Sequence, residues 1–325
     1  MPNTMRPGNV LAGRYRLVDL LNEARGGLFF RAWDKVLARH VAVHIIPRDD
    51  ERADTLMAAA RTSAVLLDPR LLRVLDAGTS GDLCYVVNEW GEGVSLDHLL
   101  DEEPLNPRRG AWIVGEVAEL IAAAHSQGIL HARLVPEAVL LDETGAVKVI
   151  GFAVDSALHG NPTTSPEAEV TDLAALLYAV LTGKWAGREG SRLPPAPDEH
   201  GKTLRPRQVR AGVPRILDTL CDEVLSPFPG PHDHGYGSAS AIAFALMDYV
   251  GDPAAMAAAE AARSRENTSP RIPRIEADPT LFPTESPPEQ QHEADPGPDT
   301  GPESDTGEET VIGAPVFDHD DPISD

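Results

Sequence analysis

The chain has 325 residues, of which 42% are hydrophobic, 24% charged and only 5% aromatic, enough for one large domain or two small ones. Lys and Arg number 28 against 51 Asp and Glu, a formal net charge of -23. This balance argues against a nucleic-acid-binding protein, which would carry a basic surface. The two cysteines, Cys84 and Cys221, exclude a disulfide framework and a zinc site. No apolar run is long enough to span a membrane and no secretory signal is present, so we expect a cytoplasmic protein.

The C-terminal part of the chain differs from the rest in charge. Residues 276–325 contain fifteen Asp or Glu, nine Pro and neither Lys nor Arg. A segment this acidic and Pro-rich buries too little apolar surface to offset its ordering entropy. We therefore expect a disordered N-terminus at 1–10, a folded domain at 11–250 and a disordered acidic tail at 251–325.

The first ninety residues predict mostly strands. Four short segments rich in β-branched and aromatic residues lie between turn signals, at 14–21, 28–33, 40–46 and 83–88. One segment differs, because residues 52–67 are Ala-rich with helical spacing and contain neither Gly nor Pro. That pattern predicts a helix within a strand-rich lobe at about 11–90.

Helical patterns dominate after Asp101. Helices are predicted at 108–127, from Asp172 to Gly183, at 213–225 and at 238–250, and two short strands at 139–141 and 147–150. A strand-rich part followed by a helical part predicts an α+β fold of two lobes, the second at about 91–250.

The order of these elements resembles the protein kinase fold, and four segments resemble kinase motifs. They are GILHARLVPEAVLL (128–141) for the catalytic loop, KVIGFA (148–153) for the D-F-G turn, VAVH (41–44) for V-A-I-K and NEWGEGVSLDHLL (88–100) for the hinge. The chain is similar to the bacterial serine/threonine kinase family. Within that family it resembles degenerate kinase-like proteins of actinobacteria associated with cell-envelope synthesis. The resemblance implies a bilobal kinase-like fold.

Kinase phosphoryl transfer depends on positioned charges, and the resemblance places other residues at those positions. His44 replaces the lysine that grips the phosphates, and the partner Glu of that lysine falls at or near Ala59. Arg133 stands at the general base, and Ala138 and Gly151 stand at the two metal ligands. Removing a general base alone costs about 10²–10⁴ in rate. The sequence therefore predicts a pseudokinase that is not an enzyme, with no catalytic residue and no metal site.

Other residues retained from the kinase pattern have structural interpretations. His131 and Phe152 are expected to pack inside the helical lobe. Asp172 is expected to cap a helix and brace the backbone of the catalytic loop. The segment Ser165-Pro166-Glu167 resembles the end of an activation segment. Its closeness to Asp172 indicates that the platform for a peptide substrate is missing.

No cofactor is expected, with metal-free ATP as the alternative. The candidate nucleotide-binding residues are Gly27, His44, Glu89, Trp90, Gly91 and Arg133. Arg133 and His44 would contact phosphate oxygens, and the backbone of the hinge would contact adenine. In the competing interpretation, Arg133 pairs with a local carboxylate such as Asp155 and apolar side chains fill the cleft.

The tail contains a candidate phosphorylation site at Thr310. This threonine follows two acidic residues and precedes Val311 and Ile312, and it resembles threonine sites of bacterial kinases that bind forkhead-associated domains once phosphorylated. A phosphate there would add about two negative charges that an Arg cluster can recognise. The expected partners are therefore proteins: a forkhead-associated domain protein and an upstream serine/threonine kinase.

Three functions remain open on the sequence alone. The chain is expected to be a scaffold or regulator in cell-envelope synthesis, recruited to the inner face of the membrane. The first alternative is a divergent kinase in which an acid outside the usual positions holds the metal. The second is a nucleotide-sensing module. Since no membrane helix follows the domain, the chain is expected to be either soluble or a piece of a longer anchored protein.

Overall fold

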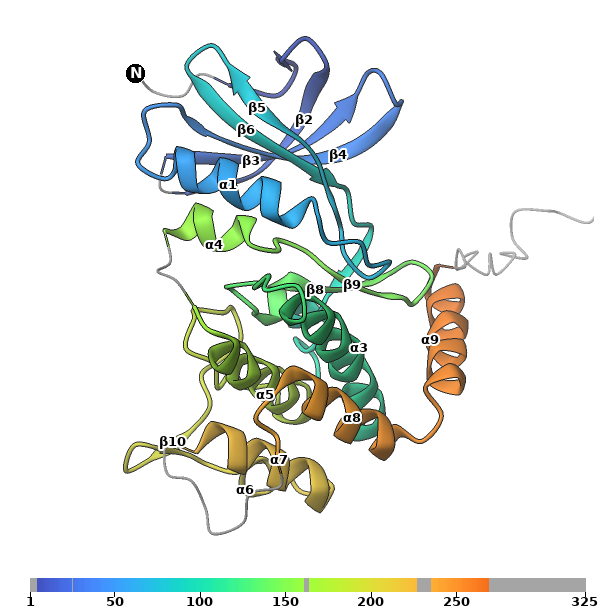
Figure 1. Ribbon diagram of the computed structural model, residues 1–325. Helices are drawn as coiled ribbons and strands as arrows, with labels where there is room; N and C mark the ends of the chain where they lie inside the picture. The colour runs from blue at the N-terminus through green and yellow to red at the C-terminus, as the bar shows by residue number, and fades with distance from the viewer. Residues whose placement is uncertain (1–4, 25, 161–163, 227–234, 269–325) are drawn as a thin grey trace, which may run out of the picture. The chain divides into compact units, whose positions relative to one another are not determined.

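A computed structural model describes residues 5–24, 26–160, 164–226 and 235–268 of the chain. Residues Met1–Arg271 form one compact unit. Within this unit a strand-rich lobe is followed by a helical lobe, as Figure 1 shows. This is the two-lobed α+β arrangement that the order of the sequence patterns predicts.

The first lobe is built on a sheet that has six strands within the described residues, paired in the order β1-β2-β3-β4-β6-β5. The strands are β1 (Val10–Leu11), β2 (Tyr15–Ala24), β3 (Gly27–Asp34), β4 (Arg39–Pro47), β5 (Val74–Ser80) and β6 (Leu83–Glu89). All of them pair antiparallel with their neighbours. Side chains of β3 alternate between buried and half-buried positions, so one face of the sheet forms the core of the lobe.

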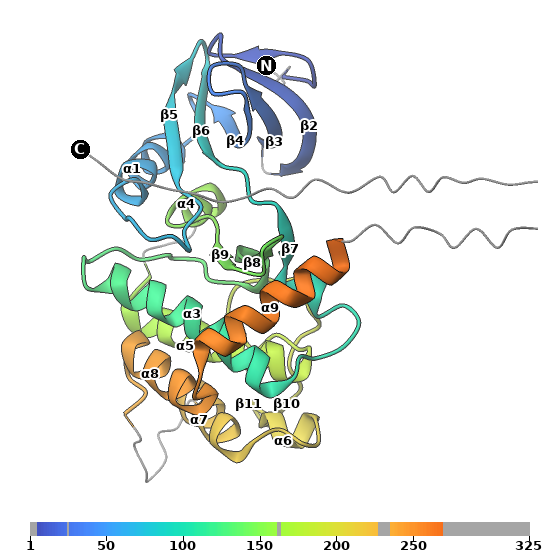
Figure 2. The same ribbon diagram turned by 90° about the vertical axis from the view of Figure 1, so that its right-hand side faces the viewer.

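Helix α1 (Ala53–Ser63) covers the part of the sheet formed by β4, β5 and β6. Its buried residues Leu56 and Ala60 pack with Ile46 of β4 and with Val86 of β6. A short helix, α4 (Val154–His159), inserts Val154 into the same apolar cluster. In Figures 1 and 2, α4 lies directly beside α1. The segment that follows the predicted D-F-G position therefore packs on the first lobe.

Within the described residues, the second lobe consists of helices and of two small sheets. The helices are α2 (Leu96–Leu99), α3 (Pro107–His125), α5 (Pro166–Thr182), α6 (Pro206–Val209), α7 (Arg215–Leu225) and α8 (Ala239–Val250). The sheets pair β7 (Gly93–Ser95) with β8 (Val139–Asp142) and β9 (Val147–Val149), and β10 (Asp198–Glu199) with β11 (Lys202–Thr203). In the described part of the chain, no helix is long and apolar enough to cross a membrane.

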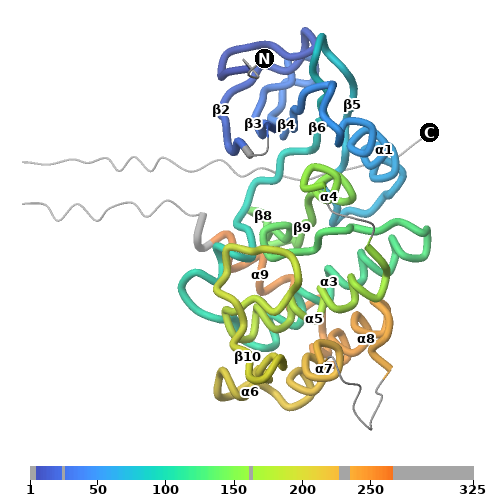
Figure 3. The backbone as a smooth tube through the Cα atoms, turned by 90° about the vertical axis from the view of Figure 1, so that its left-hand side faces the viewer, coloured from blue at the N-terminus to red at the C-terminus, as the bar shows by residue number. Residues whose placement is uncertain are grey.

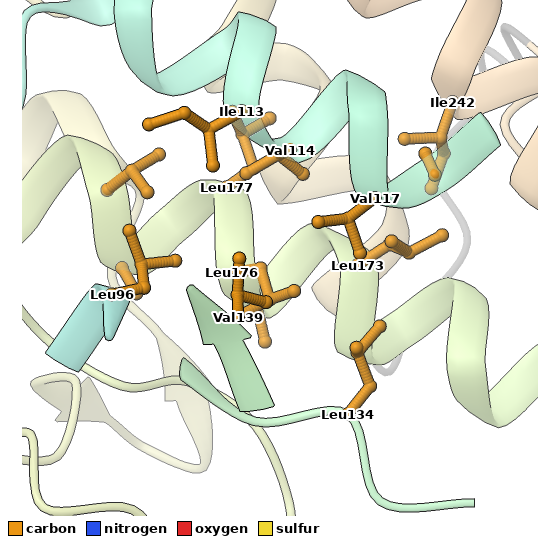
Figure 4. Close-up of a cluster of buried hydrophobic side chains, with 14 of the residues drawn as sticks. Leu96, Ile113, Val114, Val117, Leu134, Val139, Leu173, Leu176, Leu177 and Ile242 are labelled. Atoms are coloured by element: carbon orange, nitrogen blue, oxygen red, sulfur yellow. The ribbon is translucent and has the colours of Figure 1, made fainter. Parts of the chain in front are cut away.

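Helix α5 lies at the centre of this lobe, with every residue from Leu173 to Thr182 buried. Its leucines pack against Val114 and Val117 of α3 and against Leu134 of the loop before β8, as Figure 4 shows. A helix that is apolar on every side must be buried on every side. Helix α5 therefore gives a rigid support to the loop that carries residues 131–135.

The expected helix start at Asp172 is wrong, because α5 begins six residues earlier in the chain, at Pro166. The side chain of Ser165 accepts a hydrogen bond from the backbone N–H of Ala168 at 3.3 Å. Proline at the first helical position and Glu167 in the first turn further favour a helix start here. The segment that resembles the end of an activation segment is thus the N-terminus of α5.

The expected tail at 251–325 begins with a helix, so the folded part of the chain extends beyond residue 250. Helix α9 (Pro253–Thr268) lies across α3 in Figure 2. The buried carboxylate of its Glu260 accepts two hydrogen bonds from Arg109 of α3, at 2.9 and 2.5 Å. This buried pair fixes α9 to the lobe. Residues 269–325, including Thr310, lie outside the described residues.

Candidate functional site

A cavity of about 690 Å³ lies between the two lobes and contains every residue proposed above as a nucleotide contact. Strands β3, β4 and β6 contribute from one side, and the segments around β8 and α4 contribute from the other. In Figure 3 the chain segment that follows β6 descends from the first lobe toward β8. The cavity leaves open space at the place where the competing interpretation expects apolar side chains to fill the cleft.

The inner walls of the cavity are apolar. They are formed by Leu28, Ala42, Leu72, Leu140 and Ile150. At Gly91 a Cβ atom would lie 2.4 Å from Leu72 Cδ1 and 2.8 Å from Leu140 Cδ1, so glycine lets the chain pass close to these side chains. A flat, apolar ring such as adenine suits walls of this composition.

The Glu89 carboxylate is held by Arg73, away from a role in binding adenine. Arg73 Nη2 donates to Glu89 Oε1 at 2.6 Å, and the backbone N–H of Arg73 donates to Oε2 at 3.1 Å. Trp90 and Gly91 follow along the same wall. These residues therefore line the cavity, and contact between their backbone and adenine stays a prediction.

His44 lies on β4 and faces the cavity with its ring stacked on Phe29, the two ring centroids being 4.2 Å apart. Removal of the imidazole from water lowers its pKa to about 4. The ring is therefore neutral near pH 7 and supplies no positive charge to a phosphate. Ala59 on α1 packs at the edge of the apolar cluster under the sheet, so the ion pair of a typical kinase has no equivalent at these two positions.

Arg133 and Asp155 form an ion pair inside the cavity, with Arg133 Nη1 2.5 Å from Asp155 Oδ2. A Cβ atom at Gly151, whose φ is +79°, would lie 2.8 Å from Asp155 Cβ. The carboxylate of Asp155, four residues along the chain, therefore lies in the space beside Gly151. The pairing expected in the sequence analysis is present, and it neutralises the charge of Arg133.

Residues that bind a metal in a typical kinase are absent from the two expected positions. Ala138 ends the short 3-10 helix η1 (Pro136–Ala138), and its apolar side chain is buried. The carboxylates that line the cavity are instead Glu89, Glu137 and Asp155. Across the described residues, no three or more His, Cys, Asp or Glu side chains form a group that would hold a metal ion.

The loop that follows α5 contributes three lining residues that the sequence patterns do not identify. They are Gly190, Ser191 and Arg192. The Ser191 hydroxyl donates to Glu137 Oε1 at 2.8 Å, and Arg192 Nη1 donates to Asp97 Oδ2 at 2.8 Å. The run Arg-Glu-Gly-Ser-Arg at 188–192 was the available signal, since it places charged residues beside Gly and Ser.

Glu169 of α5, and not Asp172, braces the loop that resembles a catalytic loop. The backbone N–H of Ala132 donates to Glu169 Oε1 at 2.6 Å, and His125 Nε2 lies 2.8 Å from Oε2. Asp172 faces the lobe interior, and its Oδ1 has no hydrogen-bond partner among the described residues. Burial raises the Asp172 pKa to about 7. Asp172 was the wrong prediction for this role because the start of α5 was expected at residue 172, whereas α5 begins at Pro166 and places Glu169 beside the loop.

His131 and Phe152 lie together under this loop. His131 Nε2 is 3.0 Å from the carbonyl oxygen of Ile150, and the edge of its ring meets Phe152 with centroids 4.9 Å apart. Neither side chain is exposed by more than 1%. Both side chains therefore hold the loop to the segment before α4.

Curated relatives of this chain are bacterial serine/threonine protein kinases. It is 26% identical over 306 residues to PknH of Mycobacterium bovis, covering 85% of this chain and 51% of that protein. It is 28% identical over 207 residues to PknB of Mycobacterium tuberculosis, covering 54% and 33%. For PrkC of Bacillus subtilis the identity is 26% over 204 residues, covering 54% and 32%. The chain thus spans about a third to a half of the length of these relatives, and no family model matches it.

The expectation that the chain is not an enzyme is wrong by this comparison. The matching relatives are protein kinases, which points to phosphoryl transfer as the chemistry of the family. Arg133, Ala138 and Gly151 stand at the positions of the general base and the metal ligands, and they can supply neither. Any transfer by this chain must use other residues of the cleft.

Solved structures agree with the sequence relatives in fold. The kinase domain of PknI from Mycobacterium tuberculosis, as a mutant form, superposes with a TM-score of 0.59 at 18% identity, covering 77% of this chain and all of that one. The chain is therefore a homologue of bacterial serine/threonine protein kinases and has the protein kinase fold.

Proposed function

We propose that this chain is a divergent serine/threonine kinase-like protein that binds an adenine nucleotide in the interlobe cavity. The observation that carries the proposal is the open cavity of about 690 Å³, which is lined both by apolar side chains and by Arg133. Adenine fits the walls formed by Ala42 and Leu140. The bound nucleotide joins the two lobes and so sets the shape that protein partners meet.

The phosphate groups are held by arginine in this proposal. His44 is neutral near pH 7, because burial lowers its pKa to about 4. Arg133 must exchange its carboxylate partner Asp155 for a phosphate oxygen. The guanidinium of arginine is suited to this exchange, since it binds carboxylate and phosphate with the same planar fork of donors. Nucleotide binding by this route needs no metal ion.

A second candidate function is a kinase whose metal ligand has moved along the chain. The carboxylate of Asp155 supports it, because it lies beside Gly151, at the position where the family has an acidic metal ligand. In this case Asp155 releases Arg133 and binds Mg²⁺ carried by ATP. The two functions differ in one measurable way, since only the second requires Mg²⁺ for nucleotide binding.

The partners that we propose are proteins. Phosphorylation of Thr310 by an upstream serine/threonine kinase would create a docking site for a forkhead-associated domain. A scaffold of this kind in cell-envelope synthesis would be recruited to the inner face of the membrane through its partners. Incubation with a bacterial serine/threonine kinase, followed by mass-spectrometric mapping, tests this step. An unmodified Thr310 would refute it.

Isothermal titration of ATP into the purified chain tests the central part of the proposal. Arg133→Gln removes the charge but keeps hydrogen-bond donors, and we expect ATP affinity to fall by at least tenfold, or about 1.4 kcal/mol. The matched control is Arg205→Gln, since Arg205 also pairs with a carboxylate, that of Asp222, but does not line the cavity. Equal affinities of the two variants would contradict a phosphate site at Arg133.

A further inference from the structure

A serine hydroxyl and a carboxylate meet at the wall of the cavity. Ser191 Oγ donates to Glu137 Oε1 at 2.8 Å, and both residues line the same cavity as Arg133. They come from separate segments, since Glu137 belongs to η1 and Ser191 to the loop after α5. A hydroxyl within hydrogen-bond reach of a carboxylate is the arrangement of a nucleophile and its general base.

The carboxylate of Glu137 is also fixed in place. The backbone N–H of Arg192 donates to its Oε1 at 2.5 Å. The same oxygen therefore accepts two hydrogen bonds, one from this N–H and one from the Ser191 hydroxyl. Its other oxygen, Oε2, is buried and has no hydrogen-bond partner within the described residues. An unpartnered buried carboxylate oxygen is costly, and its lone pairs are available to a proton. An activated hydroxyl usually has a base that a third group orients. Here the backbone N–H of Arg192 is that third group.

Two arginines contact the segments that carry this pair, and each is itself paired with a carboxylate. Arg133 Nη2 donates to the carbonyl oxygen of Gly190, the residue before Ser191, at 3.4 Å. The guanidinium of Arg192 is held by the buried carboxylate of Asp97 at 2.8 Å. A guanidinium that exchanges its carboxylate partner for a phosphate oxygen can stabilise the negative charge of a phosphoryl group in transfer.

We propose that Ser191 accepts the γ-phosphoryl group of ATP bound in the same molecule, with Glu137 as the general base. This step rests on the proposed function, because it requires ATP in the cavity. Ser191 Oγ forms a bond to the γ-phosphorus while the bond from that phosphorus to the bridging oxygen breaks, and ADP leaves with the electron pair. The proton of the hydroxyl passes to Glu137. The resemblance places the general base at residue 133, which is an arginine in this chain. In this proposal the base is Glu137, four residues farther along.

The test is mass-spectrometric mapping of phosphate on the full chain after incubation with ATP, with and without Mg²⁺. We expect one phosphate, on Ser191, at a rate per molecule that is independent of protein concentration. Ser191→Ala abolishes it, and Glu137→Gln, which keeps an acceptor for the Arg192 N–H, slows it by about 10²–10⁴. Thr144→Ala is the matched control, because the Thr144 hydroxyl also donates to a carboxylate, that of Asp142, but neither residue lines the cavity.

A thermal unfolding assay with ATP separates the proposal of phosphoryl transfer to Ser191 from the proposal that the cavity binds ATP. If ATP stabilises the chain but Ser191 stays unmodified, the phosphoryl-transfer proposal is refuted and nucleotide binding stands. If ATP gives no stabilisation, both are refuted. Phosphate at Ser191 that persists undiminished in Glu137→Gln refutes the role of that carboxylate. A rate that rises with protein concentration refutes transfer within one molecule.

Discussion

Replacing Asp155 by asparagine should raise the affinity of the cavity for ATP. In the wild-type chain, Arg133 is paired with Asp155 at 2.5 Å, and the two side chains are only 16% and 24% exposed. A phosphate must displace this internal carboxylate before it can bind the guanidinium. The amide of the Asp155→Asn variant would keep the size and a hydrogen bond of the side chain but remove its negative charge.

The size of the effect follows from the pair that is broken. A hydrogen bond between charged groups contributes a net of about 1.5–3 kcal/mol, and binding of ATP must offset that amount in the wild-type chain. Since about 1.4 kcal/mol is a tenfold change in affinity, Asp155→Asn should lower the Kd for ATP by about ten- to a hundredfold. Loss of a like charge near the phosphates acts in the same direction.

Isothermal titration of ATP in EDTA measures this change directly. Asp222→Asn is the matched control, because Asp222, on α7, is a similarly half-buried partner of Arg205, outside the cavity lining. We expect its Kd to equal that of the wild-type chain. Weaker ATP binding by Asp155→Asn would refute the reasoning. If the weakening appeared only with Mg²⁺, the carboxylate would be a metal ligand.

Three further predictions concern stability. Burial raises the Asp172 pKa from 3.8 to about 7, so the folded state loses stability as pH rises through this range. Asp172→Asn should increase the free energy of unfolding at pH 8 by as much as about 4 kcal/mol. An unchanged pH profile of stability in denaturant titrations would contradict this. Burial lowers the His44 pKa from 6.5 to about 4, so stability falls as pH drops through that window; His44→Phe, stacked on Phe29, should show a smaller fall in Tm between pH 6.5 and 4.5. Glu260→Ala leaves Arg109 unpaired in a buried site and should cost about 3–5 kcal/mol; a Tm within about 2 °C of wild type, by calorimetry, would show that α9 is not part of the folded unit.

Much of the architecture follows from patterns that are local in the sequence. The β-branched and aromatic residues of 28–33 and 40–46 predict strands, and the long helical pattern at 108–127 predicts α3, which spans Pro107–His125. Strand β5 was missed because its sequence, VLDAGTS, contains few β-branched or aromatic residues. It forms because β6 offers a free edge to pair with, and such pairing is a tertiary effect that a local pattern does not contain.

In the candidate site, too, residues in short motifs could be predicted, whereas residues placed by contacts far apart in the sequence could not. The resemblance located Arg133, Gly151 and the hinge because each lies in a short motif. The loop at Gly190–Arg192 was not located, because its place in the cavity wall depends on contacts with Glu137 and Asp97, far away in the sequence. Glu169 was missed for a local reason, since Ser165 and Pro166 start α5 before the expected residue.

Thermal unfolding of the wild-type chain with ATP, in Mg²⁺ and separately in EDTA, tests the central claim most directly. If arginine and apolar walls hold the nucleotide, ATP at 100 times its Kd should add about 2.7 kcal/mol of stability in both conditions. The midpoint of unfolding should then rise equally with and without the metal. No shift at millimolar ATP, or a shift that EDTA abolishes, would contradict metal-free nucleotide binding in this cavity.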